Sequence, residues 1–245
     1  GTLAPPAAFD RVIELTTQQL QQNTAKLEVT GLQRNGDKLA FEATVENLAG
    51  HKFPTAYPSR RAWLRVKVTD AAGKVVFVSG DYDDRGRLVD ATGKPLASEA
   101  VGGAVEPHHA VIRDQAQVQV WEAVMQDSAG KPTYQLLRGS EYIKDNRLLP
   151  KGWKPDGPDA HDTEPAGVGS DADFVGGKDT VRLEVTVPAT GALKLEVEIL
   201  YQTLSWRYAE ELFRFRTPEV VTFAEYMEKT DTRPVTVAAT KHDLP

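Results

Sequence analysis

The chain contains no cysteine among its 245 residues. Disulfides, thiolate zinc sites, iron–sulfur clusters and covalent haem attachment through C-x-x-C-H all require cysteine, so none of them forms within this chain. Its apolar runs are far shorter than the ~20 residues that a membrane-spanning helix needs, so no membrane span is expected. Acidic residues outnumber basic ones by 35 to 29, which argues against nucleic acid as a general partner.

Common enzyme motifs are absent as well. The sequence has no G-x-S-x-G, no P-loop, no dinucleotide-binding glycine fingerprint and no H-E-x-x-H, which removes the hydrolase, nucleotide and zinc-protease templates. Charged residues make up 26% of the chain and apolar residues 40%, as in an ordinary globular domain. These features favour a non-catalytic protein over an enzyme.

Apolar and polar residues alternate along much of the chain, which is typical of half-buried strands. This pattern predicts an all-β fold, a β-sandwich of about nine strands of immunoglobulin-like or jelly-roll-like type. Asn35-Gly36 predicts a tight hairpin turn, and the Pro-Ala-Thr-Gly segment 188–191 predicts another. The clearest strand segments are 26–33, 39–45, 63–69, 75–79, 118–125, 134–137, 180–187 and 193–201.

Helical patterning is confined to the two ends of the sequence. Residues 7–23 predict one amphipathic helix, and residues 204–228 predict two short helices separated by Pro218. We therefore divide the chain into an N-terminal helix at 1–25 and a sandwich domain at 26–245.

Residues 138–179 form a long segment rich in glycine, proline and aspartate. We expect this loop to be ordered, because apolar residues are spaced through it and disordered tracts rarely contain so many. We also expect the side chains of residues 144–147 to hold it to the sandwich by hydrogen bonds. The expected apolar anchors are Tyr142, Ile143, Leu148, Leu149 and Trp153.

Three carboxylates gather near the end of this loop. Asp171, Asp173 and Asp179 accompany the pair Gly176-Gly177. Hard cations prefer several carboxylate and carbonyl oxygens, so these residues are a candidate calcium site. The alternative is an aspartate-capped turn that leads into the strand at 180–187.

Residues 47–61 join two predicted strands and contain prolines that stiffen the backbone. Such a loop could present His51 at a fixed place, and a neutral imidazole is a good ligand for haem iron. Arg60 and Arg61 close the loop and could neutralise propionates. His108 and His109 form a second such site, although isolated loop histidines are often structural.

Several segments resemble, in the same order, the cysteine-free β-rich region that lies C-terminal to the haem-binding part of bacterial multihaem c-type cytochromes. The longest begins at Glu46 and reads ENLAGHKFPTAYPSRRAWL. The others are FVSG at 77–80, YIKDNRLLPKG at 142–152, DADFVGGKD at 171–179 and LYQ at 200–202.

This resemblance implies a periplasmic or extracellular accessory domain that caps a haem-bearing domain of the same polypeptide or docks a redox partner protein. Haem c is then expected in the full-length protein, with residues 1–25 as the last helix of the haem part. His51, Arg60, Arg61, His108 and His109 become the candidate haem contacts. Ala56 stands where the resemblance leads us to expect glycine.

A second hypothesis is a stand-alone sandwich that binds a carbohydrate or another small ligand. Its candidate platforms are Trp63, Trp121, Trp153 and Trp206. Trp121 lies within an alternating strand and Trp206 opens an amphipathic helix, so both are expected in the core. Only Trp153, in the long loop, is expected to be free to meet a ligand.

Overall fold

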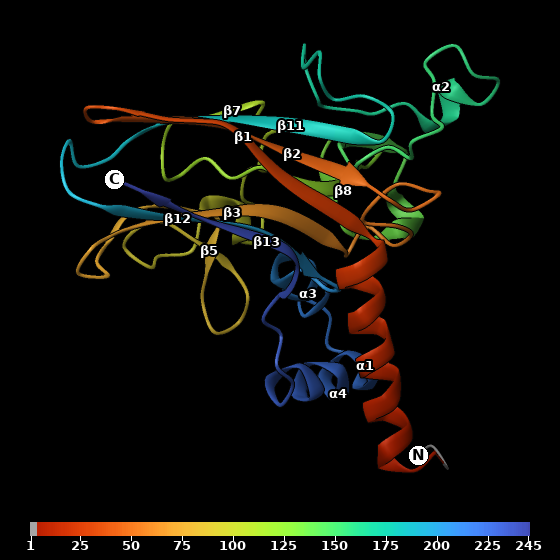
Figure 1. The fold of residues 1–245 in the computed structure, drawn as a ribbon. Coiled ribbons are helices and arrows are strands. Elements are labelled where there is room, and N and C mark those ends of the chain that lie inside the picture. Colours follow the sequence, from red (N-terminus) through yellow and green to blue (C-terminus); the bar gives the residue numbers. More distant parts are fainter. Residues whose placement is uncertain (1–3) are drawn as a thin grey trace.

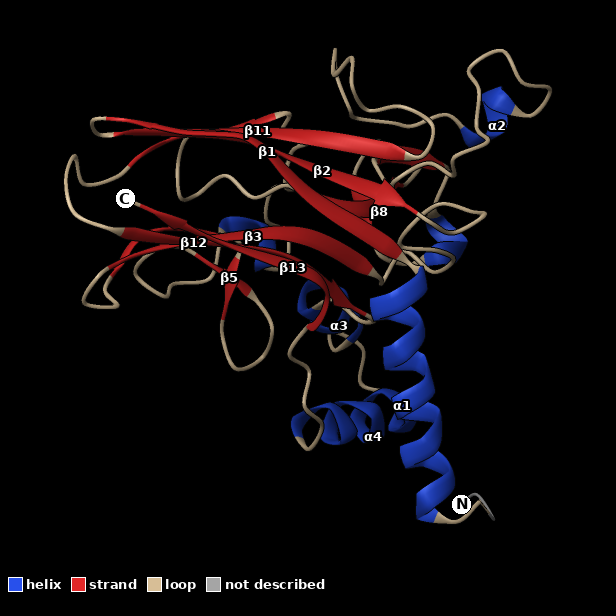
Figure 2. Cartoon of the chain, viewed as in Figure 1, coloured by secondary structure: helices blue, strands red, loops and turns tan. Residues whose placement is uncertain are grey.

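The computed structural model describes residues 4–245. Two β-sheets pack face to face, and helices gather at one end of the sandwich, from which the first helix projects (Figures 1 and 2). The helices are α1 (Pro6–Asn23), α2 (Ala160–Thr163), α3 (Trp206–Leu212) and α4 (Pro218–Glu228).

One sheet has four strands in the order β1-β2-β11-β7, and the other has seven, with β10-β8-β3-β12-β13 in line, β4 paired with β3 and β9 with β8. A separate ribbon is formed by β5 and β6. The strands are β1 (Ala25–Asn35), β2 (Lys38–Asn47), β3 (Arg61–Asp70), β4 (Val75–Ser79), β5 (Asp81–Tyr82), β6 (Leu88–Val89), β7 (Val111–Ile112), β8 (Val120–Gln126), β9 (Pro132–Thr133), β10 (Glu141–Asp145), β11 (Lys178–Thr186), β12 (Leu193–Gln202) and β13 (Val235–Leu244).

The core lies between the two sheets because each strand alternates buried and exposed side chains, as a pleated strand must. From the four-stranded sheet, every second residue of β2 and β11 is buried, and β3 and β12 bury theirs from the opposite sheet. The fully buried members include Leu39, Ala43, Val45, Leu64, Val66, Val68, Val181, Leu183, Val185, Val197 and Ile199. The predicted sandwich is therefore confirmed.

The hairpin expected at 188–191 is wrong, because the two strands that it joins lie in different sheets. Strand β11 pairs with β2 and β7, whereas β12 pairs with β3 and β13. Both strands turn an apolar face to the same core, so their alternation is satisfied equally well by an arch between sheets. The hairpin expected at Asn35-Gly36 does form, and Gly36 adopts a φ of 59° there.

Other strand predictions need correction. The sequence analysis did not predict the final strand, β13, because small and polar residues fill most of it and the alternation of apolar with polar residues is weak. Residues 134–137 were expected to form a strand, but a 3-10 turn occupies Leu136–Arg138 instead. The expected helices at both ends are present as α1, α3 and α4.

The long segment 138–179 packs onto the sandwich. It contains β10 and α2, and Leu148 and Leu149 are fully buried. Leu148 and Phe53 form a bridge of two backbone hydrogen bonds: the nitrogen of Phe53 donates to the carbonyl of Leu148 at 2.9 Å, and the nitrogen of Leu148 donates to the carbonyl of Phe53 at 2.8 Å. Tyr142, expected to be an anchor, is instead 44% exposed.

Side chains from residues 144–147 hold this segment in place, as expected. Lys144 pairs with Glu122 on β8 at 3.0 Å. Asp145 pairs with Lys52 at 2.6 Å and with Arg147 at 2.7 Å. Within residues 4–245, no helix has both the length and the apolar character to cross a membrane.

Candidate functional site

The loop between β2 and β3 is fixed from inside by one amide. Asn47 is buried, and its Nδ2 donates to the carbonyls of His51 at 2.8 Å and of Leu148 at 3.0 Å. Its Oδ1 accepts from the nitrogen of Ala49 at 2.9 Å. The backbone at His51 is thereby held, while the His51 side chain is exposed.

His51 lines a cavity of about 810 Å³ between α1 and the 48–55 loop, which we call the α1 groove. Val12, Ile13 and Leu20 line it from the helix, and Phe53 lines it from the loop, with further contributions from β12 and β13. No residue of α1 is buried, and the helix leaves Phe9, Val12, Ile13 and Leu15 exposed. Within residues 4–245, the helix thus leaves an uncovered apolar surface, part of which lines the same cavity as His51.

The adjacent arginines of this loop have different environments. Arg60 also lines the α1 groove, and its Nη1 donates to the carbonyl of Thr55 at 3.1 Å. Arg61 is only 4% exposed; its guanidinium pairs with buried Glu99, and its Nε donates to Gln202 at 2.9 Å. Only Arg60 is therefore placed to meet a group bound near His51.

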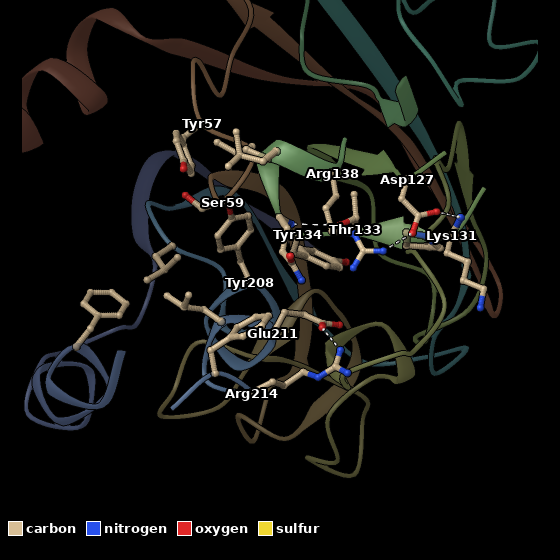
Figure 3. A pocket seen from close by; sticks show the side chains of 18 residues that line it. Tyr57, Ser59, Asp127, Lys131, Thr133, Tyr134, Arg138, Tyr208, Glu211 and Arg214 are labelled. Carbon is tan, nitrogen blue, oxygen red and sulfur yellow. Dashed lines mark hydrogen bonds and ion pairs between the residues drawn. The ribbon is translucent and has the colours of Figure 1, made fainter. Parts of the chain in front are cut away.

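A second cavity, of about 650 Å³, lies beside α3 and α4 (Figure 3). Tyr57, Tyr134 and Tyr208 line it, and Tyr208 makes edge-on ring contacts with both of the others. Burial raises the pKa of Tyr208 to about 12, so its hydroxyl stays protonated. Apolar residues and the pair Glu211–Arg214, 3.0 Å apart, complete the lining. Rings and charged groups of this kind suit a small polar ligand.

His108 lies in a buried polar cluster and not at the surface. Its side chain is 3% exposed, and its Nε2 lies 2.8 Å from Asp171. The amides of Gln119 and Asn146 face its Nδ1 at 2.8 and 3.0 Å. Burial lowers the pKa of His108, which the bond to Asp171 only partly offsets.

Both amides are fixed in orientation by the backbone. The Oε1 of Gln119 accepts from the nitrogen of His109, and the Oδ1 of Asn146 accepts from the nitrogen of Glu122. Their NH₂ groups therefore donate to Nδ1 of His108, so the proton of the neutral ring is on Nε2. Both ring nitrogens are occupied within the fold.

Asp179 is the most deeply buried acid of this cluster, with no exposed area. Its Oδ2 accepts from Trp121 at 2.7 Å and from Gln119 at 3.1 Å. Burial, reinforced by the charge of Asp171, raises the pKa of Asp179 to about 7 despite these donors. Burial and Asp171 also raise the pKa of Asp173.

The structure thus separates the predicted haem contacts. His51 and Arg60 meet at the α1 groove. Arg61 and His108 are internal, and the ring of His109 lies 3.4 Å from Glu106. The candidate cation ligands Asp171 and Asp179 do come together, with potential ligand atoms within 4.8 Å of each other and of His108.

Several site residues were missed by the sequence analysis. The tyrosine cavity brings together positions from three distant segments, and no local pattern marks them. Gln119, which contacts His108, is a polar residue between two valines, and its role depends on tertiary contacts. Asn146 was expected to hold the long loop to the sandwich, but its contact with His108 was not predicted.

Three of the four tryptophans are buried, and the fourth, Trp153, is partly buried. Trp63 and Trp121 are fully buried, and Trp206 is 5% exposed. Trp153, expected to be free, packs partly against the core, and its Nε1 donates to Thr163 at 3.0 Å.

Among known proteins, the similarity found for this chain is to the fold of a solved structure. No family model matches the chain, and no curated protein matches it either. Among solved structures, the chain is similar to a penta-haem cytochrome c552 from Thermochromatium tepidum, with a TM-score of 0.53 and 16% sequence identity. The match covers 93% of this chain and 41% of that protein, so the chain spans less than half of its structural neighbour. At this identity the likeness is one of fold: this chain is similar to part of a protein that carries five haems.

Proposed function

We propose that this chain is a non-catalytic accessory domain of a multihaem electron-transfer cytochrome, and that its α1 groove docks the haem-bearing part of the same polypeptide. The observation that carries this proposal is the fold match, in which nearly the whole chain corresponds to less than half of a penta-haem cytochrome. More than half of that cytochrome has no counterpart in this chain. We assign the haem-bearing part to that portion, because this chain has no cysteine with which to attach haem c.

The α1 groove is the surface that best suits such a partner. Its helical wall exposes Val12 and Ile13 to 62% and 64%, which is unfavourable unless another surface covers them. Multihaem domains offer apolar haem edges and anionic propionates. The apolar wall of the groove could pack against a haem edge, and the guanidinium of Arg60 could pair with a propionate.

His51 is placed to serve that junction. Its side chain is exposed and its backbone is held through Asn47, so the imidazole can reach outward with limited backbone freedom. An axial ligand of haem iron must keep one position, so a side chain on a fixed backbone suits this role. We propose that His51 is an axial ligand or a hydrogen-bond partner of one haem at this interface.

The test uses the haem-bearing polypeptide that contains this chain. His51→Ala is compared with the wild type by low-temperature EPR and by potentiometric titration of the haems. The matched control is His161→Ala, because His161 is a surface histidine on α2 with a 94% exposed side chain. A changed spin state or potential in His51→Ala alone supports the haem role. If every haem keeps both properties, His51 is only a loop residue.

A second candidate function rests on the tyrosine cavity: binding of a carbohydrate or another small polar ligand. Aromatic faces beside charged groups are suited to sugar rings. Calorimetric titration of this chain with a panel of neutral and acidic oligosaccharides tests it. Tyr208→Ala should abolish any binding, whereas Tyr226→Ala, on the exposed face of α4, should leave it intact.

A further inference from the structure

Three acidic residues are buried within residues 4–245, and two of them have cationic partners. Glu99 pairs with the guanidinium of Arg61. Asp145 pairs with Lys52 and Arg147. This is the usual arrangement, because an uncompensated buried charge is very costly.

Asp179 is the exception. It is fully buried, and its Oδ2 receives only the neutral donors of Trp121 and Gln119. Its Oδ1 is buried and has no hydrogen-bond partner among residues 4–245. No lysine or arginine forms an ion pair with it in the described part of the chain.

Two further carboxylates adjoin Asp179 and add to the uncompensated charge. The side chain of Asp171 is 4% exposed, its Oδ2 accepts from the ring of His108, and no lysine or arginine within residues 4–245 forms an ion pair with it. Asp173 donates its backbone nitrogen to Asp171 at 3.2 Å, and its own Oδ1 is buried without a partner. Arg182, a cation whose charge acts on Asp173, pairs with Glu42 at 3.4 Å.

The separation of the Asp171 and Asp179 oxygens suits a single ion. Potential ligand atoms of Asp171 and Asp179 lie within 4.8 Å of each other. Calcium binds oxygen at about 2.4 Å, so two oxygens on one ion are at most about 4.8 Å apart. The unpartnered oxygens of Asp173 and Asp179 supply acceptor sites that no protein group uses.

His108 does not belong to the ligand set, although it lies within reach. A histidine that binds a metal through Nε2 must carry its proton on Nδ1 and donate it to an acceptor. Here Nδ1 faces the NH₂ groups of Gln119 and Asn146, whose orientations the backbone fixes. The remaining donors are all oxygens, which selects a hard cation over zinc or copper.

We propose that Asp171, Asp173 and Asp179 form a calcium site, in which the ion fixes the end of the 166–179 loop to the start of β11. Loop carbonyls and water would complete the coordination. Magnesium fits less well, because it keeps several waters and requires near-octahedral geometry. Through Trp121, the ion would also reinforce the contact between the two sheets. This proposal is independent of the haem-docking function.

The experiment uses this chain after dialysis against a chelator. Calcium chloride is titrated into the protein, and binding is followed by calorimetry and by the midpoint of thermal unfolding. We expect one calcium ion per chain and a rise in the midpoint, with magnesium much less effective. Terbium luminescence excited through tryptophan gives an independent signal, because Trp121 lies against Asp179.

Variants locate the site. Asp173→Asn should weaken calcium binding at least tenfold, and because Asp173 is only partly buried, this variant is expected to fold. Asp179→Asn should abolish binding. Asp162→Asn, at an exposed position on α2, is the matched control and should bind as the wild type does.

Two outcomes would overturn the proposal. The first is that calcium changes neither the heat signal nor the unfolding midpoint of the wild type, in which case Asp179 is accommodated by holding a proton. The second is that calcium binds, but with equal affinity in Asp173→Asn and in the wild type, which would place the ion elsewhere.

Discussion

The indole of Trp121 and the carboxylate of Asp179 join the two sheets of the sandwich. The Nε1 of Trp121 on β8 donates to Oδ2 of Asp179 on β11 at 2.7 Å, and neither residue has exposed area. Sandwich sheets usually meet through apolar side chains alone. This polar contact fixes their relative position at the end where the long loop enters β11.

Trp121→Phe should therefore destabilise the domain more than Trp63→Phe does. Both tryptophans are fully buried and both substitutions keep an aromatic ring, but Trp63 donates to a backbone carbonyl, that of Gly80, at 2.9 Å. Hydrogen bonds to charged groups are worth about 1.5–3 kcal/mol, against about 0.5–1.5 kcal/mol for neutral pairs. Urea unfolding measures the difference at a pH above the pKa of Asp179, which is about 7, so that its carboxyl is ionised. Equal losses would show that the carboxylate contributes no more than a carbonyl does.

Asp145 should account for part of the acid sensitivity of the fold. Burial alone would raise its pKa, but the hydrogen bonds and charges of Arg147 and Lys52 outweigh this effect and lower the pKa. A carboxyl whose pKa is lower in the folded state stabilises the fold above its unfolded pKa, near 3.9, and this contribution is lost as the pH falls through the folded value.

Asp145→Asn should cost about 3 kcal/mol at pH 7, because it leaves two cations without their buried partner. Its free energy of unfolding should then change less than that of the wild type between pH 5 and acidic conditions. Asp231→Asn is the control: Arg233 lowers the pKa of Asp231 to about 2, but this pair is fully exposed and screened by solvent. If the free energy of unfolding falls equally with pH in Asp145→Asn and in the wild type, Asp145 does not account for the acid sensitivity.

Ala56 offers a stabilising substitution. Its φ of 63° lies in the left-handed region, where an L-residue with a side chain is strained and glycine is not. Ala56→Gly should raise the free energy of unfolding by about 0.5–1 kcal/mol. Ala49→Gly, in the same loop but without a positive φ, should lower it. If both substitutions destabilise equally, the strain at Ala56 is relieved by its surroundings.

The sequence predicted which faces are buried better than which strands are neighbours. Alternation correctly predicted one buried face for the segments 39–45 and 193–201, because a side-chain period of two reports only burial. Pairing depends on where a connection leads, and nothing local distinguishes the arch after β11 from a hairpin. Strand β13 was not predicted because small and polar residues separate its two buried apolar residues, Val237 and Leu244.

The candidate sites show the same limit. Asp171, Asp173 and Asp179 were visible as a dense local motif with glycines, and the structure brings at least two of them together. His51 and Arg60 were found because they share one stiff loop. The separation of Arg61 from Arg60 follows from the register of β3, and its partner Glu99 lies in a distant segment that no local pattern connects to it.

The exposed face of α1 leads to the last prediction. Val12 and Ile13 are 62% and 64% exposed, so replacing both with serine in this chain should change the free energy of unfolding by no more than about 0.5 kcal/mol. Ile199→Ala, at a fully buried position of β12, should cost about 3 kcal/mol and shows that the assay responds to core changes.

In the haem-bearing polypeptide that we propose, the same Val12→Ser and Ile13→Ser pair should cost about 2–3 kcal/mol, because docking would bury both side chains. The comparison is made by denaturant unfolding of the two proteins, each followed by tryptophan fluorescence. A small effect in both proteins would show that this face of α1 is not covered by the haem part. A large effect in the isolated chain would show that α1 packs against its own sandwich more closely than its exposure indicates.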